Sequence, residues 1–341
     1  MTTKPFSFEF FPTRTPEGRA KQVITRKQLS QFNPSFFSCT SGAGGSTREG
    51  TMQTIGDILS EGIAAAPHLP CIGMTADEVK ALLTQYKAMG VKHIVALRGD
   101  IPSGIGLGMD GMRYANELVE LIKTEHGSDF HVEVAAYPEF HPQARSAEDD
   151  INHFVRKVNA GADSAITQYF YNADAYFRFV DDVQGRGVRI PIIPGIMPIA
   201  SFAKLARFSD TCGAEIPRWL RLKLQSYADD SASIKALALD VVTDMCERLL
   251  REGAPGLHFY TLNQAGLVST ICQRLGYQTA EKSSLHLLEM ENSHEKHCVD
   301  ICRRPHLVCL PNHCAERMHT QRHRATQRIT PTVGTIPSDI A

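Results

Sequence analysis

Apolar residues along the chain gather into short runs that alternate with longer amphipathic segments. The short runs are rich in β-branched and aromatic residues, which is typical of buried strands. Between them, segments such as 76–89, 147–160 and 173–184 carry apolar residues at three- and four-residue spacing, which predicts helices. The eight predicted strands are 6–10, 36–40, 64–69, 93–97, 132–137, 165–170, 190–196 and 257–262.

Strands that alternate with helices at intervals of about thirty residues indicate βαβ units and a parallel sheet. Eight such units favour a closed (β/α)8 TIM barrel, with extra helical segments at 217–225 and 231–251 before the last strand. An open doubly wound sheet is the alternative. The chain lacks a Gly-x-Gly-x-x-Gly motif after its first strand, which a dinucleotide-binding domain of that class would carry.

The pattern changes near residue 277. Residues 278–341 hold four of the nine Cys and seven of the fourteen His, and only 284–290 shows a short helical pattern. We therefore expect residues 1–277 to form the barrel domain and 278–341 to be an irregular Cys/His-rich tail. The spacing of Cys298, Cys302, Cys309 and Cys314 lacks the paired knuckles of common zinc sites, so we predict no metal site.

Composition narrows the class of protein. A net charge of −1 gives no reason to expect nucleic acid or an anionic membrane as a partner. The longest uncharged stretch, residues 62–76, contains two prolines and a histidine and is too short for a transmembrane helix. The N-terminus has no apolar signal segment. The first five cysteines are scattered singly, as in a reducing compartment, so we expect a cytoplasmic protein.

Polar residues lie at or after the ends of the predicted strands, where an α/β barrel keeps its active site. Polar groups in otherwise apolar strands are costly to bury without partners. Each such residue taken singly also fits a structural role, for example a solvated glutamate or an Arg98–Asp100 ion pair. Their convergence at one edge is what predicts a site, and the residues are Glu9, Thr40, His68, Arg98, Asp100, Tyr137, His141, Gln168, Tyr260 and Asn263.

Taken in order, these segments resemble the catalytic domain of the methylenetetrahydrofolate reductase family. The resemblance covers residues 5–277, and the set of motifs in this order is highly specific although each motif alone is weak. The matching stretches are Phe-Glu-Phe-Phe-Pro from Phe8, Thr-Ser-Gly-Ala-Gly-Gly-Ser-Thr-Arg from Thr40, Ala-Pro-His-Leu from Ala66, Ala-Leu-Arg-Gly-Asp from Ala96, Ala-Ala-Tyr-Pro-Glu from Ala135, Ile-Thr-Gln-Tyr-Phe from Ile166, Pro-Gly-Ile-Met-Pro from Pro194 and His-Phe-Tyr-Thr-Leu-Asn from His258.

The resemblance implies a (β/α)8 barrel that carries FAD and reduces 5,10-methylenetetrahydrofolate to 5-methyltetrahydrofolate for methionine synthesis. It would be an oxidoreductase acting on CH–NH donors. NADH or NADPH would reduce the flavin and leave before the folate enters, in a ping-pong sequence, and the short architecture favours NADH. The family generally forms homo-oligomers, and we expect one here.

The resemblance also assigns catalytic roles. Opening of the folate's five-membered ring requires protonation of N10, and Glu9 matches the family's proposed general acid; a desolvated glutamate flanked by phenylalanines suits the role. Asp100 matches the aspartate between flavin and pterin, where a carboxylate can stabilise a developing cation.

The resemblance also implies a set of FAD-binding residues. In it, the positive charges of Arg98 and Lys157 would pair with the negative charge of the pyrophosphate. The implied FAD residues are Thr40, Ser41, Ala43, His68, Arg98, Gly99, Asp100, Tyr137, His141, Asp150, Asn152, Arg156 and Lys157. Gln168 would contact folate and nicotinamide in turn, and Phe208 would stack on either. The implied substrate residues are Gln168, Lys204, Phe208, Tyr260, Leu262 and Gln264.

Several positions depart from the family pattern. Thr13 replaces a second proline, Lys204 stands where bacterial relatives often carry a folate-binding glutamine, and Gln264 replaces an arginine that would hold the acidic end of the folate. Lys204 is expected to compensate with its charge. The tail is too short for the S-adenosylmethionine-binding regulatory domain of eukaryotic relatives, so we expect no feedback inhibition by that compound.

Two other functions stay open on the sequence. A flavin-free, pterin-binding barrel methyltransferase would explain a folate-like site but would not need the Arg98–Gly99–Asp100 stretch or the Asp150 and Lys157 pair. A folate- or flavin-binding protein without turnover would explain Gln264 and the tail, although the retention of Glu9 and Asp100 argues against it.

Overall fold

The computed structural model describes residues 4–41, 48–99, 111–228 and 230–279 of the chain. Contacts divide the chain into a unit of Met1–Ala280 and a second unit of Glu281–Ala341. The second unit lies outside the described residues, and so do the Gly-rich loop from Gly42 and the segment that begins at Asp100. The boundary at residue 277 and the irregular tail stay predictions.

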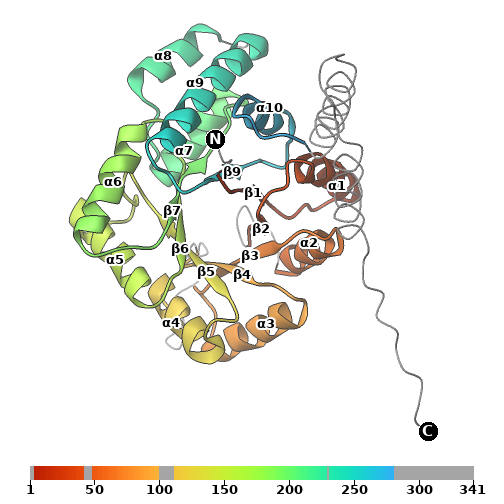
Figure 1. The fold of residues 1–341 in the computed structure, drawn as a ribbon, viewed down its shortest axis with the longest axis vertical. Coiled ribbons are helices and arrows are strands. Elements are labelled where there is room, and N and C mark those ends of the chain that lie inside the picture. Colours follow the sequence, from red (N-terminus) through yellow and green to blue (C-terminus); the bar gives the residue numbers. More distant parts are fainter. Residues whose placement is uncertain (1–3, 42–47, 100–110, 229, 280–341) are drawn as a thin grey trace, which may run out of the picture. The chain divides into compact units, whose positions relative to one another are not determined.

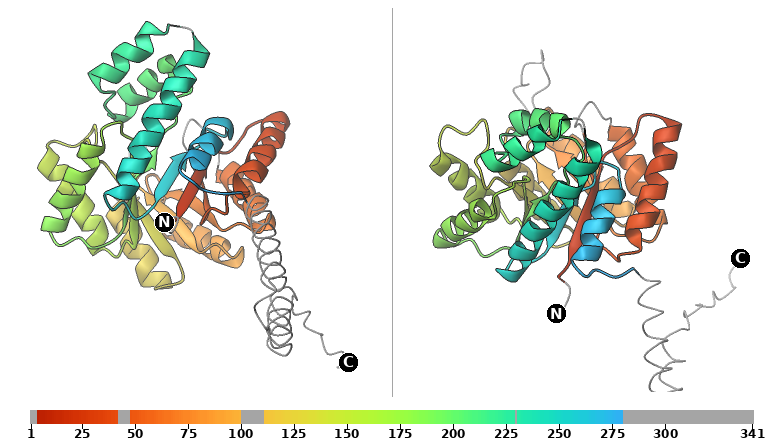
Figure 2. Two further views of the ribbon diagram at one scale, coloured as in Figure 1. Left: turned by 45° about the horizontal axis from the view of Figure 1, so that its top comes forward. Right: turned by 90° about the horizontal axis from the view of Figure 1, so that it is seen from above.

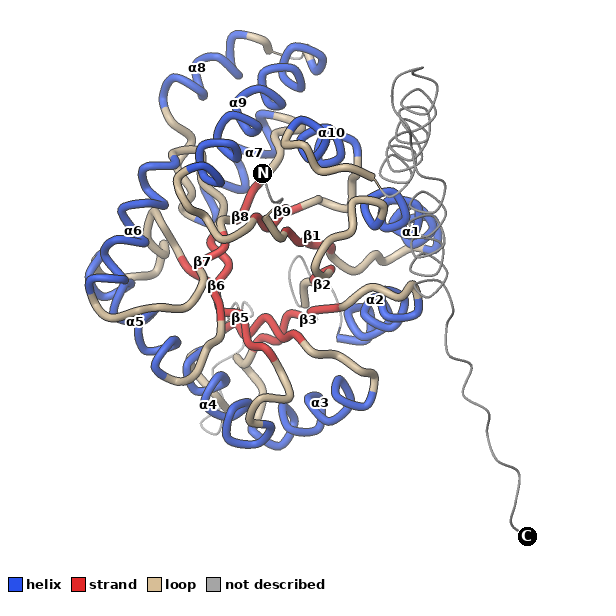
Figure 3. The backbone as a smooth tube through the Cα atoms, viewed as in Figure 1, coloured by secondary structure: helices blue, strands red, loops and turns tan. Residues whose placement is uncertain are grey.

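Nine parallel strand segments form one sheet that curls into a ring (Figures 1 and 3). Their order in the sheet is β7-β6-β5-β4-β3-β2-β1-β9-β8. The segments are β1 (Phe6–Phe10), β2 (Phe37–Cys39), β3 (Ala65–Pro70), β4 (His93–Leu97), β5 (His131–Ala136), β6 (Ser164–Thr167), β7 (Ile192–Ile193), β8 (Gly195–Ile196) and β9 (Leu257–Tyr260).

The two ends of this sheet are parts of one stretch of chain. β7 pairs with β6, β8 pairs with β9, and only Pro194 separates them. A proline has no N–H to donate to a ladder, so the predicted seventh strand splits at Pro194. Its first half pairs with β6 and its second half with β9. The sheet is therefore a nearly closed (β/α)8-type barrel, as predicted, and the open doubly wound alternative is excluded.

The helices form the outer ring around the strands (Figures 1 and 2). Their first turns use side-chain caps: Thr75 and Glu78 form a reciprocal capping box at α3, and the Ser146 hydroxyl accepts from the Asp149 N–H at α5. The helices are α1 (Pro16–Ser30), α2 (Arg48–Ser60), α3 (Ala76–Ala88), α4 (Ala115–His126), α5 (Ala147–Asn159), α6 (Ala173–Gly185), α7 (Phe202–Cys212), α8 (Arg218–Ser226), α9 (Ser231–Arg251) and α10 (Gly266–Arg274).

The predicted extra helices are present between β8 and β9, but only one of them, α8, is additional to the barrel. The long helix α9 packs against α6 and α10, so it occupies the outer-ring position of the seventh βα unit. α7 and α8 are the additional pair, and α8 lies at the outer edge of the molecule in Figure 1. α7 nevertheless carries two of the predicted substrate residues.

Apolar side chains form two separate layers because successive residues of a strand point to opposite faces. The larger layer lies between strands and helices and includes Phe6, Phe8 and Phe10 of β1. A smaller cluster inside the ring is centred on Phe36, Ala66, Val95 and Ile166. The other inward positions are polar to an unusual degree, including Ser7, Glu9, Ser38, His68, His93, Glu133 and His258.

The predicted single cysteines are unpaired. Cys39, Cys71, Cys246 and Cys272 are buried free thiols, and Cys212 is half-buried. Burial raises the pKa of Cys71 to about 11, which keeps that thiol protonated.

Candidate active site

Glu9 lies inside the barrel between His68 of β3 and His258 of β9. Its carboxylate oxygen Oε2 is 3.3 Å from His68 Nε2 and 3.6 Å from His258 Nε2. The Ser7 hydroxyl holds the other ring nitrogen, Nδ1, of His258 at 2.7 Å. Strand register explains the cluster, since Ser7 pairs with His258 and Glu9 with Tyr260 in parallel strands whose alternate residues face the interior.

His68 is held neutral. Burial lowers the pKa of its imidazole; the Glu9 carboxylate raises it in part, and His258 lowers it. We therefore regard the 3.3 Å approach to Glu9 as a contact with a neutral ring rather than an ion pair. Within the described part of the chain, neither His68 Nε2 nor His258 Nε2 has a hydrogen-bond partner, although both atoms are buried. Buried polar atoms without partners are costly, and they gather around Glu9.

Glu9 points away from Phe8 and Phe10, as alternation along a strand predicts. Phe8 and Phe10 flank Glu9 in sequence, but both are fully buried in the outer layer between strands and helices. Glu9 points the other way, with 18% of its side chain exposed, and its neighbours are imidazoles. Strand alternation decides this, and it places Glu9 where it can meet a ligand rather than in a phenylalanine-lined environment.

Tyr260, on the strand next to Glu9, reaches across to β6. Its hydroxyl donates to the Thr167 carbonyl at 2.7 Å, and the Gly195 N–H donates to Thr167 Oγ1 at 2.9 Å. A Cβ atom on Gly195 would lie 2.1 Å from the Thr167 carbonyl oxygen, so only glycine fits there. Burial raises the pKa of the Tyr260 hydroxyl well above its ordinary value, so Tyr260 is a hydrogen-bond donor and not an acid here. Gln168 follows β6 directly, and its Oε1 accepts from the Tyr169 N–H.

The turn after β9 is tied to the end of β1. Leu262 and Asn263 both adopt positive φ, at 52° and 56°. Asn263 compensates for this backbone conformation with its side chain, which accepts from the Phe11 N–H at 3.1 Å and donates to the Phe11 carbonyl at 2.9 Å. Gln264 is exposed immediately after this turn.

A second group of predicted residues forms a connected network after β4 and β5. Arg98 donates to the Gln143 side chain at 2.5 Å, the Gln143 N–H donates to His141 Nδ1 at 3.1 Å, and the His141 N–H donates to Asp150 at 3.0 Å. The Tyr137 and His141 rings pack edge to face with centroids 4.6 Å apart. The structure thus brings together four residues that the sequence predicted for one ligand.

Gly99, Thr40 and Ser41 are three further residues predicted for the same ligand. Gly99 has a φ of 84°, and a Cβ there would lie 2.7 Å from the Pro70 Cβ, so glycine is required after β4. Thr40 Oγ1 is buried and has no hydrogen-bond partner among the described residues. Ser41 is half-buried next to it, and the predicted site residues Ala43 and Asp100 lie outside the described residues.

Lys157, predicted to contact the FAD pyrophosphate, contacts the backbone of β5 in this structure. Its ammonium donates to the Ala135 carbonyl, and burial lowers its pKa to about 8, with Asp150 opposing the shift. Lys157 thus holds α5 against β5 in this structure, and a role in binding pyrophosphate would require it to leave that carbonyl. Asn152 and Arg156 lie on the same helix with exposed side chains.

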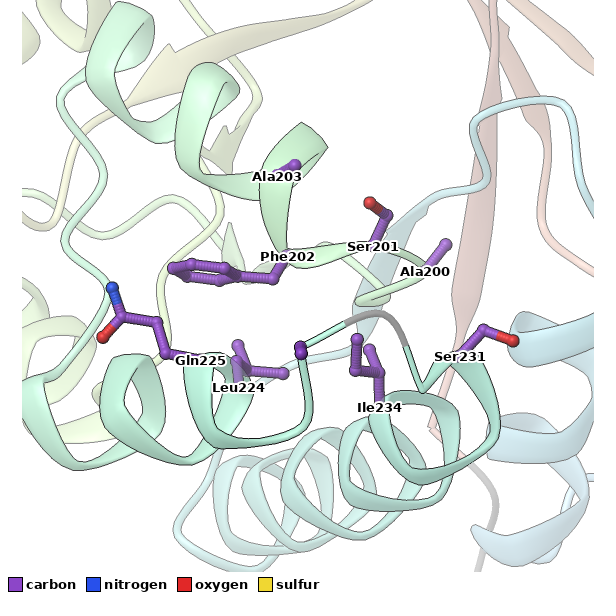
Figure 4. A pocket seen from close by; sticks show the side chains of 9 residues that line it. Ala200, Ser201, Phe202, Ala203, Leu224, Gln225, Ser231 and Ile234 are labelled. Atoms are coloured by element: carbon purple, nitrogen blue, oxygen red, sulfur yellow. The ribbon is translucent and has the colours of Figure 1, made fainter.

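The remaining predicted substrate residues lie on α7. Lys204 and Phe208 are both exposed and are one helical turn apart, so they share a face of the helix. A cavity of about 320 Å³ lies at the start of this helix, against α8 and α9 (Figure 4). Phe202, Leu224 and Ile234 line it, and none of its nine lining residues is titratable. Groups able to act as acid or base lie instead around Glu9, inside the barrel.

Sequence reasoning missed several residues that the structure places in the site. Ser7 and His258 adjoin Glu9, Gln143 bridges Arg98 to His141, and Thr167 anchors Tyr260. Period-two counting would have found Ser7 and His258, since they lie two positions before Glu9 and Tyr260 in the same strands. Gln143 has no comparable signal because it lies in an irregular loop.

A parallel α/β barrel with a carboxylate, imidazoles and a cationic network around its carboxyl-end loops has the architecture of a barrel enzyme. Comparison with family models matches residues 2–276 to "Methylenetetrahydrofolate reductase". The chain belongs to this family. None of the described helices has the length and hydropathy needed to cross a membrane.

Curated relatives agree with this assignment. The chain is 42% identical over 271 residues to the 5,10-methylenetetrahydrofolate reductase of Escherichia coli K12, covering 79% of this chain and 90% of the relative. It is 39% identical over the same length to that of Pectobacterium carotovorum, covering 79% and 89%. It is 33% identical over 295 residues to "Methylenetetrahydrofolate reductase (NADH) 1" of Arabidopsis thaliana, covering 83% of this chain and 50% of the relative.

A solved structure shares the fold. It is described as an uncharacterised protein from Clostridium thermocellum that binds two copies of 5-methyl-5,6,7,8-tetrahydrofolic acid. The TM-score is 0.55 at 17% identity, and the match covers 80% of this chain and 94% of that one.

Proposed function

We propose that this protein reduces 5,10-methylenetetrahydrofolate to 5-methyltetrahydrofolate, with electrons from NADH or NADPH that pass through FAD in a ping-pong sequence. The family supports the reaction, and the observation that carries the mechanism is Glu9 in contact with His68 and His258 inside the barrel. The bacterial relatives are 5,10-methylenetetrahydrofolate reductases, and the fold neighbour binds 5-methyl-5,6,7,8-tetrahydrofolic acid.

The residues fit FAD. Thr40 Oγ1 is a buried hydroxyl without a partner within the described ranges, and Arg98 supplies positive charge through a network with Gln143. When bound, FAD would supply the hydride chemistry, accepting electrons from the nicotinamide and passing them to the folate.

Glu9 would act as the general acid. Its Oε2 lies inside the barrel beside the Nε2 atoms of His68 and His258, and from there the carboxyl would give a proton to the folate's N10 as the five-membered ring opens. Ser7 positions the His258 ring from behind. Tyr260, fixed on the Thr167 carbonyl, would form the wall against which the pterin lies. Asp100, which lies outside the described residues, keeps its proposed role of stabilising positive charge.

The substrate's distal end would lie along α7. Phe208 offers an exposed ring for stacking, and Lys204, one turn away, offers a positive charge to the acidic end of the folate. Gln264, exposed after the β9 turn, cannot supply that charge. Homo-oligomer formation and a cytoplasmic location stay predictions.

An absorption spectrum of the purified protein tests the proposal. A flavin band that bleaches on anaerobic addition of NADH and returns with methylenetetrahydrofolate is expected. A protein without flavin that still binds folate would point to the methyltransferase alternative. A flavin that bleaches but does not reoxidise with folate would refute the reductase assignment and favour the binding protein without turnover.

A further inference from the structure

A second polar cluster lies at the opposite end of the barrel from Glu9. His93 is the first residue of β4, His131 is the first residue of β5, and Glu133 follows two positions later. The pairing of His93 with His131 in the parallel ladder brings the two rings together, with centroids 5.1 Å apart. The carboxyl end of the barrel, where the proposed reaction takes place, does not use any of these residues.

The three side chains converge on one point. Glu133 Oε1 lies 2.9 Å from His93 Nδ1 and 3.6 Å from His131 Nε2. One ligand atom from each residue can be chosen so that all three lie within 4.8 Å of one another. Around a tetrahedral ion with bonds of about 2.0 Å, neighbouring ligand atoms are about 3.3 Å apart, and the two measured separations fall on either side of that value.

Glu133 itself points to a missing partner of positive charge. Its side chain is only 3% exposed, and its second oxygen, Oε2, is buried without a hydrogen-bond partner in the described part of the chain. A buried carboxylate that is satisfied on one oxygen only is costly. Structural packing alone does not explain why a glutamate is placed there between two imidazoles.

We propose that His93, His131 and Glu133 form a binding site for a divalent transition metal ion, with Zn²⁺ as the ion that this ligand set suits first. The ion would be reached from the amino-terminal mouth of the barrel, where the His131 and His93 side chains are 42% and 29% exposed. Three protein ligands leave a fourth position for water, and the Ser164 hydroxyl, 2.9 Å from His131 Nε2, lies close enough to hydrogen-bond that water.

The site would be structural. The ion would link the starts of β4 and β5, while Phe36 packs against His93 at 5.0 Å and against His258 at 6.2 Å and so separates the two polar clusters. The spacing of the tail cysteines led us to predict no metal site, whereas these three ligands lie in the barrel. The proposed metal site does not depend on the proposed reductase reaction.

Cobalt titration of the full-length protein tests the site and separates it from the tail. The chelator-treated protein is titrated with Co²⁺ in the presence of reductant, and the bound equivalents and the visible spectrum are recorded. Wild type is expected to bind one equivalent more than the His131→Ala and Glu133→Gln variants. The Co²⁺ absorption band that wild type shows and the two variants lose should have no thiolate charge-transfer character, because the ligands are nitrogen and oxygen only.

The His153→Ala variant, which removes an exposed histidine of α5, is the matched control and should bind as wild type does. Zn²⁺ at a hundredfold excess over its Kd should raise the melting temperature of wild type by about 5 °C more than that of either cluster variant. His131 is largely exposed, so its variant keeps the test valid if Glu133→Gln fails to fold. Equal stoichiometry in all four proteins, or a lost band of thiolate character, would overturn the proposal.

Discussion

Glu9 of β1 and His68 of β3 meet inside the barrel, with Oε2 and Nε2 3.3 Å apart, although β2 lies between their two strands in the sheet. The imidazole is neutral because its burial outweighs the attraction of the carboxylate. The pair is therefore a contact between the Glu9 carboxyl and a neutral imidazole, and it lies where the proposed general acid would act.

Replacement of the Glu9 carboxyl should separate the two half-reactions. In a Glu9→Gln variant, reoxidation of the reduced flavin by methylenetetrahydrofolate should slow by about 10²- to 10⁴-fold, the usual contribution of a general acid, while flavin reduction by NADH changes little. Stopped-flow measurement of each half-reaction checks this. Glu17→Gln, an exposed change on α1, is the control, and an unimpaired folate half-reaction in Glu9→Gln would exclude Glu9 as the acid.

Gly195 should tolerate no side chain. A Cβ there would lie 2.1 Å from the Thr167 carbonyl and 2.6 Å from Tyr260 Cε2, and neither backbone nor packed ring can move aside cheaply. Gly195→Ala should lower the free energy of unfolding by more than about 3 kcal/mol. Gly266→Ala, at an open position in α10, should instead be neutral or stabilising by up to about 1 kcal/mol. Thermal or urea unfolding of the two variants gives the comparison, and similar stabilities would contradict the proposed crowding.

Asn263 should contribute to the free energy of unfolding through both its backbone conformation and its side chain. Asn263→Ala removes two hydrogen bonds to Phe11 and places alanine at a φ of 56°, which together should cost about 2–4 kcal/mol. Asn263→Gly loses the same hydrogen bonds but keeps the backbone relaxed, so its cost should be smaller by about 1 kcal/mol. Unfolding in urea measures both. If the two variants are equally stable, the positive φ carries no cost here.

Glu139 should make stability depend on pH. Burial, and secondarily the nearby Glu215 carboxylate, raise its pKa from an ordinary 4.5 to about 7, although the Glu215 N–H donates to it. Between these two values the folded protein binds more protons than the unfolded chain, so its stability falls as pH rises from about 4.5 to about 7 and is constant above.

The size of this change is on the order of 1–2 kcal/mol, after the full shift is reduced for solvent screening at a partly exposed group. Glu139→Gln keeps the hydrogen bond from Glu215 and removes the ionisation. The difference in unfolding free energy between the variant and wild type should therefore grow in favour of the variant from pH 5 to pH 8. A difference that does not change with pH would refute the raised pKa.

Lys204 should supply the charge that Gln264 lacks. Lys204→Ala should raise the KM for methylenetetrahydrofolate by about 3- to 10-fold, as expected for an exposed charge, with kcat nearly unchanged. Adding Gln264→Arg to that variant should restore part of the affinity. Steady-state kinetics on the three proteins decides, and an unchanged folate KM in Lys204→Ala would mean that Lys204 does not compensate.

The sequence alone determined the barrel and most of the residues around its carboxyl end. Eight buried runs separated by amphipathic segments have few other ways to bury their apolar faces, and the caps at Thr75 and Ser146 are local features of sequence. The polar residues at strand ends converge because all strands are parallel, so the strand pattern was enough to group Glu9, His68 and Tyr260.

Only the tertiary structure decided which atoms meet. Register between β1 and β9 brought His258, with Ser7 bonded to its other ring nitrogen, to Glu9. The Lys157 ammonium donates a hydrogen bond to the Ala135 carbonyl, and Gln143, in an irregular loop, links Arg98 to His141. At the other end of the barrel, the pairing of β4 with β5 assembled His93, His131 and Glu133, which are separated by up to 40 positions and share no local motif. Contacts between strands depend on register across the sheet, and that is a property of the whole fold rather than of any stretch of sequence.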